Sequence, residues 1–365
     1  MASIHLLDDL KKIRQMDPQD MLGAVETFDR QCQVAYQMAR AIKLPKMKDV
    51  DNVVVLGMGG SAIGGDLLRC YMSEILSVPI IVLRGYEVPR WVSQRTLAIA
   101  SSYSGATEET LSAYREARKR GARIVVQTQG STLGKMAQKD GFAWVNITPP
   151  RYFHGAPIYQ PRAALGYSFF PMLGIIEKVF PVPEQALAVK EAISIIKRCI
   201  DAYRREVPLK SNVAKKLAVA CFKHLPIIYS AQERLEVVAL RWRAQFNENS
   251  KILAMTNVLP EMNHNEIVGW SGVQKFPQKW PVIFLQDKGD HRQVKRRFEI
   301  IAEIIRPLCA EIYSLNSDGR GLLARLFSLI CLGDFVSVYL AVLNKVDPSP
   351  VPPIAYLKAQ LASKK

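Results

Sequence analysis

Short apolar runs alternate with amphipathic stretches along the chain, beginning at residue 52. Five runs rich in β-branched and small apolar residues predict buried strands, at residues 53–57, 79–85, 96–102, 122–128 and 142–148. Between them, apolar residues recur at helical spacing near residues 62–72, 108–120 and 133–139. Because alternating strands and helices form parallel sheets covered on both faces, this half of the chain predicts one doubly wound α/β domain.

The second half repeats the pattern after a connector that carries Pro181 and Pro183. Its predicted strands lie at residues 225–230, 250–256, 281–286 and 310–316, with helical stretches at 234–246 and 294–305. The 365 residues therefore predict two tandem α/β domains, each with a doubly wound parallel sheet and with helical extensions at the two ends. We expect an N-terminal extension at 1–48, domains at 49–183 and 184–345, and a C-terminal arm and helix at 346–365.

Two segments bear on where the protein resides. The N-terminal sequence MASIHLLDDLKKIRQMD mixes charged and apolar residues at helical spacing and has no signal-peptide core. The apolar stretch from Leu326 to Leu343 approaches membrane-spanning length, but Asp334 near its centre would cost roughly 2.5–3.5 kcal/mol in a bilayer, so we expect a buried helix. The six cysteines are far apart and form no C-x-x-C pair, which is typical of reduced thiols. These features predict a cytoplasmic protein without a membrane partner.

Charge narrows the class of ligand. With 49 Lys and Arg against 33 Asp and Glu, the net charge is +16, which favours anions such as nucleic acid, acidic lipids or phosphorylated metabolites. The basic clusters, for example Arg115–Arg120 and Lys295–Arg297, fall in helical stretches without interleaved aromatic residues, so we expect no nucleic-acid partner. The five histidines do not occur at metal-ligand spacing, and we expect no metal.

Two loops are candidates for binding phosphate. The loop after the first strand, GMGGSAIGG at 57–65, contains G-x-G-x-x-A, which also occurs in dinucleotide sites; Arg84 after the second strand would then suit only a 2′-phosphate. The loop after the third strand, SSYSGAT at 101–107, brings hydroxyl groups to a helix N-terminus, where a phosphate monoester would be held. Alternatively, Ser104 or Thr107 only caps that helix. Together with Ser61, the hydroxyls favour a phosphate monoester.

Seven segments in order carry a specific resemblance. They are GMGGSAIGGD (57–66), SYSGATEETL (102–111), QPRAALGYSFF (160–170), RWRAQFNENSK (241–251), PEMNHNEIVGW (260–270), LGDFVSVYLAVL (332–343) and DPSPVPPIAYLK (347–358). With them the chain resembles the bifunctional phosphoglucose/phosphomannose isomerase family, built from two sugar isomerase (SIS) domains of flavodoxin-like type. The resemblance implies a cofactor-free and metal-free enzyme that interconverts glucose 6-phosphate, and mannose 6-phosphate, with fructose 6-phosphate through an enediol.

The resemblance also implies roles for individual residues. Glu248 would move the proton between C1 and C2, His264 and Lys358 would open the sugar ring, and Arg162 would face the enediolate oxygen. The phosphate would lie on Gly60, Ser61, Ser102, Ser104 and Thr107. His264 would reach the active site of a partner subunit, which implies a homodimer. Without the resemblance, Glu248 and Lys358 would be interpreted as solvated surface side chains, and His264 as a loop histidine.

The chain departs from the family pattern at two positions. Ala106 replaces the usual Asn in the loop after the third strand, and Ser349 replaces Thr in DPTPV, so Ser349 is a candidate residue for substrate specificity. Glu266 is a rival carboxylate to Glu248, and we assign it to orienting His264. Three other functions stay open at this point: a sugar-phosphate sensor, an isomerase of another sugar phosphate, and an NADP-dependent oxidoreductase that uses Arg84.

Overall fold

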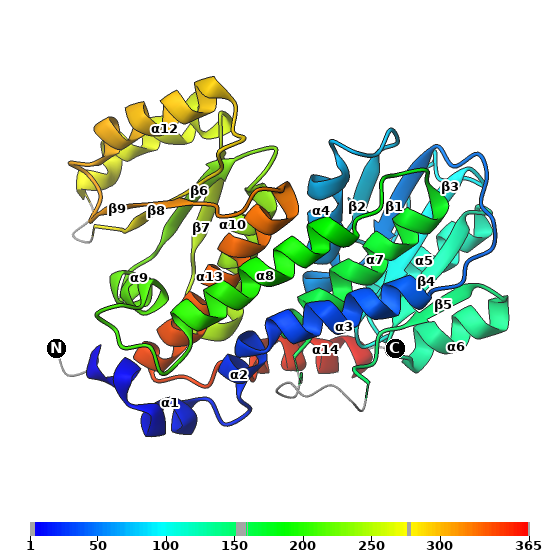
Figure 1. Ribbon diagram of the computed structural model, residues 1–365, viewed down its shortest axis with the longest axis horizontal. Coiled ribbons are helices and arrows are strands. Elements are labelled where there is room, and N and C mark those ends of the chain that lie inside the picture. The colour runs from blue at the N-terminus through cyan, green and yellow to red at the C-terminus, as the bar shows by residue number, and fades with distance from the viewer. Residues whose placement is uncertain (1–3, 151–157, 159, 276–278, 364–365) are drawn as a thin grey trace. The chain divides into compact units, whose positions relative to one another are not determined.

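The computed structural model describes residues 4–150, 158, 160–275 and 279–363 (Figure 1). The chain divides into two compact units. The four-stranded unit comprises Met1–Val25, Cys199–Ser317 and Leu329–Lys365, and the five-stranded unit comprises Glu26–Arg198 and Asp318–Ser328. Each unit is therefore built from separate segments of the chain. The predicted domain boundaries stay a prediction.

The sheet of the five-stranded unit is parallel throughout and has the order β2-β1-β3-β4-β5. Its strands are β1 (Asn52–Leu56), β2 (Ile80–Leu83), β3 (Thr96–Ser101), β4 (Arg123–Thr128) and β5 (Ala143–Asn146). The chain passes from β1 outward to β2 and then returns to the other side of β1. This reversal between β1 and β3 confirms the predicted doubly wound fold and marks the sheet edge at which folds of this class bind their ligands.

Alternate residues of these strands face opposite layers of helices, as period-two alternation requires. Val54 and Leu56 lie in a cluster with α5 (Glu108–Lys119) and α6 (Ser131–Asp140). On the other face, Val55 contacts Gly65 of α4 (Gly59–Met72). Helix α4 packs against α7 (Leu165–Val179), which in turn packs against α3 (Phe28–Ala41). Helix α3 belongs to this unit, whereas Met1–Val25 belong to the other.

The four-stranded unit has a second parallel sheet with the order β7-β6-β8-β9. Its strands are β6 (Ile227–Ala231), β7 (Met255–Leu259), β8 (Val282–Gln286) and β9 (Ile312–Asn316). The helices of its chain segments are η1 (Ile4–Asp8), α1 (Leu10–Met16), α2 (Met21–Glu26), α9 (Val213–Cys221), α10 (Glu236–Gln245), η3 (Phe246–Ser250), η4 (Glu261–His264), α11 (Glu266–Gly269), η5 (Trp270–Lys275), α12 (Arg292–Ile305) and α14 (Pro352–Ser363). Helices α8 (Ala186–Tyr203) and α13 (Leu322–Asn344) contribute residues to both units.

One predicted strand was wrong in position. The apolar run at 250–256 does not begin a strand, because helix α10 continues into the π-helical turn η3, whose last residue, Ser250, is fully buried. Lys251 then ends the turn in a left-handed conformation, with φ at 58°. Leu253 is 74% exposed, and the strand begins only at Met255. The buried polar residues of this segment therefore pack, while one of its apolar residues does not.

Helix α13 is the apolar stretch that the sequence predicted as a buried helix. By length and composition it is the one described helix that could cross a membrane, and its apolar window is buried throughout. Arg241 of α10 forms two hydrogen bonds with Asp334, Nε to Oδ1 at 3.0 Å and Nη2 to Oδ2 at 2.7 Å. Trp242 Nε1 donates to the carbonyl of Leu329 at 2.8 Å. The prediction is confirmed: the charge of Asp334 is matched by a buried arginine, as burial of an ion requires.

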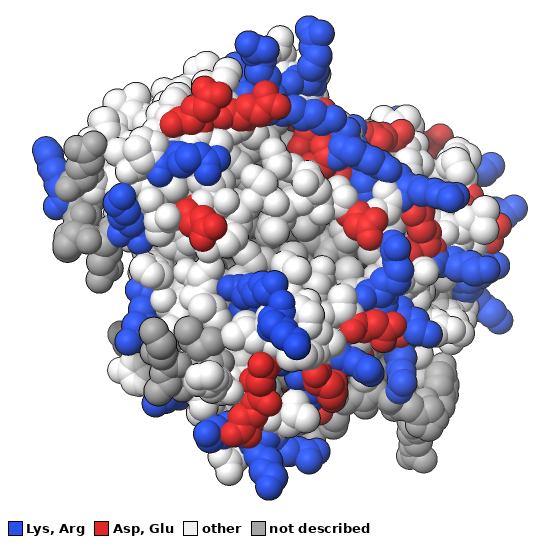
Figure 2. All heavy atoms as spheres, turned by 60° about the vertical axis from the view of Figure 1, so that its left-hand side comes forward, with Lys and Arg blue, Asp and Glu red and all other residues white. Residues whose placement is uncertain are grey.

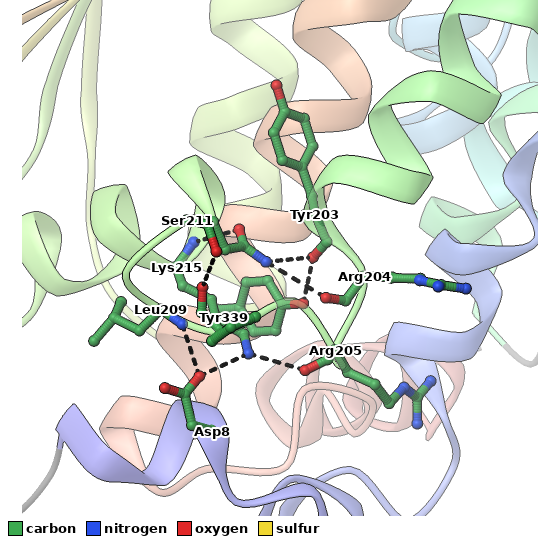
Figure 3. A network of polar contacts seen from close by, with 10 residues as sticks. Asp8, Tyr203, Arg204, Arg205, Leu209, Ser211, Lys215 and Tyr339 are labelled. Atoms are coloured by element: carbon green, nitrogen blue, oxygen red, sulfur yellow. Dashed lines mark hydrogen bonds and ion pairs between the residues drawn. The ribbon is translucent and has the colours of Figure 1, made fainter.

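A buried lysine attaches the N-terminal segment to its unit (Figure 3). Lys215 on α9 is fully buried, and its Nζ donates to Asp8 Oδ1 at 3.1 Å and to the carbonyl of Arg205 at 2.9 Å. The same Asp8 oxygen accepts from the backbone N–H of Leu209 at 2.8 Å, and the ring of Tyr339 lies 5.5 Å from Lys215 Nζ. Because an unpaired buried ammonium group is costly, these contacts hold η1 against α9.

We expect Asp8→Asn to lower the free energy of unfolding by about 1–2 kcal/mol, because it removes the carboxylate charge that faces the buried Lys215 ammonium. Chemical denaturation would measure the change. Asp201→Asn, at an exposed position on α8, is the matched control and should change stability by less than about 0.5 kcal/mol. Equal losses in the two variants would contradict this account.

Candidate active site

The two loops predicted to bind phosphate lie side by side in the five-stranded unit. They follow β1 and β3, whose residues Leu56 and Ala100 are paired in register. A Cβ atom added at Gly57 would lie 3.0 Å from the carbonyl oxygen of Ser101 and 3.3 Å from Cβ of Ser61. Both loops therefore open at the reversal of the strand order, where parallel α/β sheets bind their ligands.

The hydroxyls of the second loop are arranged for more than capping. Thr107 is the N-cap residue of α5, but its side chain makes no capping hydrogen bond. Its Oγ1 lies 2.9 Å from Oγ of Ser102, which accepts from the backbone N–H of Gly105 at 3.1 Å. Ser104 is exposed, and its Oγ lies 3.4 Å from the N–H of Ala106. The first turn of α5 thus keeps its positive end for a ligand, and the simple capping alternative does not describe Thr107.

Arg162 lies close to the first loop. It belongs to the short helix η2 (Pro161–Ala163), which packs against the start of α4: a Cβ atom at Gly60 would lie 3.1 Å from the carbonyl oxygen of Pro161. The Arg162 side chain is buried, and its Nη1 donates to Gln160 Oε1 at 3.4 Å. The structure thus brings an arginine from a distant segment to the first loop. Glycine is needed at position 60 because the two backbones approach closely.

The Arg84 side chain, which would have to bind a 2′-phosphate in a dinucleotide site, is paired with a carboxylate of its own unit. Its guanidinium forms an ion pair with Asp66 of α4, in the same unit. The contact gives Arg84 a structural role between β2 and α4, and it removes the main support for the oxidoreductase alternative.

In the four-stranded unit, Glu248 lies on the π-helical turn η3 and is half-buried. The residues that follow it anchor the turn to α13: Asn249 Nδ2 donates to Ser337 Oγ at 2.9 Å, and Ser250 Oγ donates to the Ser337 carbonyl at 2.6 Å. π-Helical turns occur frequently at functional sites because they redirect a side chain within a helix. The anchoring fixes the backbone from which the Glu248 carboxylate projects.

The segment that carries Ser349 is linked to the same turn. Lys251 Nζ donates to the carbonyl oxygens of Glu248 and Pro348, the second at 3.1 Å. Ser349 is buried, and its backbone N–H donates to Asp347 Oδ1 at 2.8 Å. Lys251 was not singled out in the sequence, although its place directly after the Glu248 motif was a usable signal. Through it, the structure brings Glu248 and the predicted specificity position into one neighbourhood.

His264 is exposed at the end of η4, on a segment held firmly by its neighbours. Glu266 accepts hydrogen bonds from the hydroxyl of Tyr229 and from Asn257 Nδ2, the latter at 2.5 Å. Trp270 Nε1 donates to the Tyr229 hydroxyl at 3.0 Å. Burial, followed by the hydrogen bond to Glu266, raises the pKa of Tyr229, so this hydroxyl stays a proton donor.

The sequence did not indicate Tyr229, Asn257 or Trp270 as site residues, since each stands within an ordinary strand or apolar stretch. Their contacts bind Glu266 into the core of the unit, and this supports our assignment of Glu266 to orienting the segment rather than to proton transfer.

Lys358 lies on the terminal helix α14 and is exposed. The face that carries it is apolar, because Ile354 and Leu361 lie one turn before and one turn after Lys358 and are 41% and 48% exposed. The predicted helix is confirmed, and its apolar face is uncovered in this single chain.

The candidate residues thus fall into two sets. The phosphate loops and Arg162 meet in the five-stranded unit, while Glu248, His264, Lys358 and Ser349 lie in the four-stranded unit. Among the described residues, no group of three or more His, Cys, Asp or Glu side chains is arranged to hold a metal ion. On the face shown in Figure 2, Lys and Arg side chains are scattered and Asp and Glu side chains lie between them.

Comparison with known proteins identifies the two domains and the family. Residues 46–152 match the SIS domain, and residues 210–361 match the bacterial phospho-glucose isomerase C-terminal SIS domain. A bifunctional phosphoglucose/phosphomannose isomerase of Caldicellulosiruptor bescii is 42% identical over 94% of this chain and 99% of its own length. A protein of the same description from Aquifex aeolicus is 32% identical over 85% of this chain and 90% of its own length.

A hypothetical protein from Thermus thermophilus, known from its crystal structure, has the same fold, with a TM-score of 0.74, 14% identity, and coverage of 99% of this chain and 94% of the other. The fold and the paired loops therefore define a protein built from two SIS domains. Within that class, the chain belongs to the bifunctional phosphoglucose/phosphomannose isomerase family.

The phosphate loop after β3 depends on Gly105. Its φ is 70°, and an added Cβ atom would overlap the carbonyl oxygen of Gly130 and lie 2.7 Å from Thr128 Oγ1. We expect Gly105→Ala to cost more than about 3 kcal/mol in unfolding free energy, or to displace the loop and weaken binding of inorganic phosphate at least about tenfold. Denaturation and calorimetric titration would measure the two effects.

Gly121→Ala is the matched control. Its φ of 76° imposes the same backbone strain, but the nearest atom to an added Cβ is 4.0 Å away. It should cost only about 1–2 kcal/mol and leave phosphate binding unchanged. If the two variants behaved alike, the close approach at Gly105 would not matter to the loop.

Proposed function

We propose that this protein is an aldose–ketose isomerase that interconverts glucose 6-phosphate, and mannose 6-phosphate, with fructose 6-phosphate. The observation that carries the proposal is the pair of neighbouring loops after β1 and β3, with the Arg162 segment against the first of them, in a chain that matches named isomerases over almost its whole length. The sensor alternative has no support from the relatives.

The substrate phosphate lies between the loops after β1 and β3 in this proposal. Gly60 and Ser61 supply the start of α4, and Ser102, Ser104 and Thr107 supply hydroxyl groups at the start of α5. Two helix N-termini and several hydroxyl donors match the charge and the three oxygens of a phosphate monoester. The replacement of Asn by Ala106 removes an amide but leaves these hydroxyls in place, so phosphate binding is retained.

Glu248 is the base of the reaction. Its carboxylate takes the proton from C2 of the aldose; the electrons of the C–H bond form the C1=C2 double bond, and the carbonyl oxygen becomes the enediolate oxygen. The proton then returns to C1, the hydroxyl proton on O2 passes to O1, and the C2 carbonyl forms, which gives the ketose. Arg162 stabilises the charge on oxygen, as a fixed cation does best in a buried setting. C1 is reduced and C2 is oxidised by the same electron pair, so the reaction needs no external oxidant or reductant.

Ring opening precedes this step and uses His264 and Lys358. Opening requires a proton on the ring oxygen and removal of a proton from the C1 hydroxyl, which a histidine near neutral pH can transfer. The Glu266 contacts with Tyr229 and Asn257 hold the His264 segment for this purpose. Return of the proton to either face of the enediol, after a bond rotation, gives glucose or mannose. Ser349, beside the Glu248 turn, is placed to influence that ratio.

A homodimer completes the site in this proposal. His264 is exposed, Val268 four residues later is 71% exposed, and the Lys358 face of α14 is apolar and uncovered. Apolar residues exposed on the elements that carry two catalytic groups favour burial against a second copy, with the polar residues exchanged into its active site.

We expect the purified protein, supplied with fructose 6-phosphate and excess chelator, to form both glucose 6-phosphate and mannose 6-phosphate, quantified separately. Glu248→Gln should lower kcat by roughly 10²–10⁴-fold, because an amide cannot accept the proton. The control Glu303→Gln, exposed on α12, should retain full turnover. A different result is a folded protein that gains thermal stability from the sugar phosphate but forms neither aldose from fructose 6-phosphate. That result would favour a sensor instead.

The dimer proposal predicts complementation between inactive chains. If each site takes Glu248 from one chain and His264 from the other, mixing Glu248→Gln and His264→Ala chains after partial unfolding should restore about a quarter of wild-type activity, since half the dimers are mixed and each has one complete site. Turnover after refolding is the measurement. Mixed dimers without activity would show that His264 acts within its own chain or not at all.

A further inference from the structure

A cavity exists in the four-stranded unit, at the place in its sheet that corresponds to the phosphate loops of the other unit. The strand order β7-β6-β8-β9 means that the chain passes from β6 outward to β7 and returns to the other side of β6. The order therefore reverses between β6 and β8. A cavity of about 310 Å³ opens there, next to Ala231 at the end of β6 and to Asp290 and His291 after β8. This volume is within the usual range for small-ligand sites, roughly 300–1,000 Å³.

One side of the cavity is suited to an anion. Arg234 and Arg297 both line it, and so does His291, the N-cap residue of the 14-residue helix α12. One arginine guanidinium can bind two phosphate oxygens at once, and the positive end of a helix attracts the same negative charge. Arg297 is half-buried, and its Nη1 donates to Asn263 Oδ1 at 3.2 Å.

The rest of the lining is suited to a polyol. Asp290 is 6% exposed; its Oδ2 accepts from the N–H of Asp287 at 2.8 Å, whereas Oδ1 has no hydrogen-bond partner within the described ranges. Burial raises the pKa of Asp290 to about 6, so the group is mostly ionised near neutral pH. Glu233 adds a second, exposed carboxylate, and Leu259, Pro260 and Val294 form an apolar wall. Asp290 Oδ1 has less than 1 Å² of accessible surface, so a ligand hydroxyl can donate to it only after the side chain turns toward the cavity.

We propose that this cavity binds a small phosphorylated sugar or polyol as a second ligand of the chain. The phosphate lies on Arg297, Arg234 and the start of α12, the hydroxyls donate to Asp290 and Glu233, and the carbon skeleton covers the apolar wall. The proposal uses no residue of the phosphate loops after β1 and β3. A dianionic end, a row of hydroxyls and an apolar face on one small molecule match the three parts of this lining.

The position of the cavity makes it a regulatory site for the proposed reaction. Leu259 and Pro260, which line it, precede η4 directly, and Arg297 bonds to Asn263, the neighbour of His264. A phosphate on Arg297 competes with Asn263 for the guanidinium and so changes how the His264 segment is held. This consequence rests on the proposed role of His264, whereas binding to the cavity does not.

The test uses glucitol 6-phosphate, which has the hydroxyls and phosphate of a hexose phosphate but no carbonyl, so it is not turned over. In calorimetric titration we expect about two molecules bound per wild-type chain, one in the cavity and one at the phosphate loops, and about one in Arg297→Gln. Arg296→Gln removes the same charge from the adjacent position of α12, outside the cavity lining, and should retain two. Val294→Trp, which fills the cavity without a change of charge, should also retain only one.

A single molecule per wild-type chain would overturn the proposal, as would equal losses in Arg297→Gln and Arg296→Gln, which would indicate only a general effect of charge. Should Arg297→Gln fail to fold, Val294→Trp decides, together with hydrogen exchange of the wild-type protein: glucitol 6-phosphate should slow exchange at residues 287–297, and unchanged exchange there would contradict binding. Turnover of fructose 6-phosphate is measured separately, so failure of this site and failure of the isomerase proposal give different results.

Discussion

The pairing of β1 with β3 is the contact on which the phosphate site depends. Because β2 lies on the outer side of β1, the loops after β1 and β3 turn away from each other toward opposite layers of helices, at the sheet edge where folds of this class bind their ligands. The in-register backbone of Leu56 and Ala100 then sets the separation of the two loops. At positions 57 and 60, a Cβ atom would lie within about 3 Å of backbone from another segment, so both positions require glycine. The close approach brings the segments that carry Ser61, Ser102 and Arg162 together.

In the four-stranded unit, the main requirement is to hold the Glu248 carboxylate in place on the turn η3, where helix α10 ends. Helix α13 supplies the support: Asp334 pairs with Arg241, and Ser337 bonds to both Asn249 and Ser250. These buried polar contacts surround the π-helical turn, so Glu248 projects from rigid backbone. A similar principle holds the His264 segment, where Glu266 is bonded to Tyr229 and Asn257. In both places an exposed or half-exposed functional group stands on a buried and hydrogen-bonded support, as preorganised sites require.

Much of this organisation could be predicted from the sequence. Eight of the nine strands in the described part of the chain overlap the predicted apolar runs closely, because buried parallel strands are continuous β-branched runs with little competing pattern. The strand predicted at 250–256 was wrong in position because the apolar residues of this run do not form the buried contacts. Ser250 is buried there, whereas Leu253 is exposed. The capping alternative for Thr107 was equally open in the sequence, since only geometry shows that its hydroxyl meets Ser102 and not the helix N–H groups.

The sequence by itself determined the class of fold, the family, the residues at the carboxyl ends of β1 and β3, and the buried character of α13, since these follow from local periodicity and from motifs that are contiguous in the chain. Only the tertiary structure decided that residues 1–25 and α3 belong to different units, that Arg84 is occupied by Asp66, that Lys251 joins Glu248 to the Ser349 segment, and that a cavity opens between β6 and β8. Each of these depends on contacts between residues far apart in the chain, and the side-chain periodicity of a single segment contains no information about its partner.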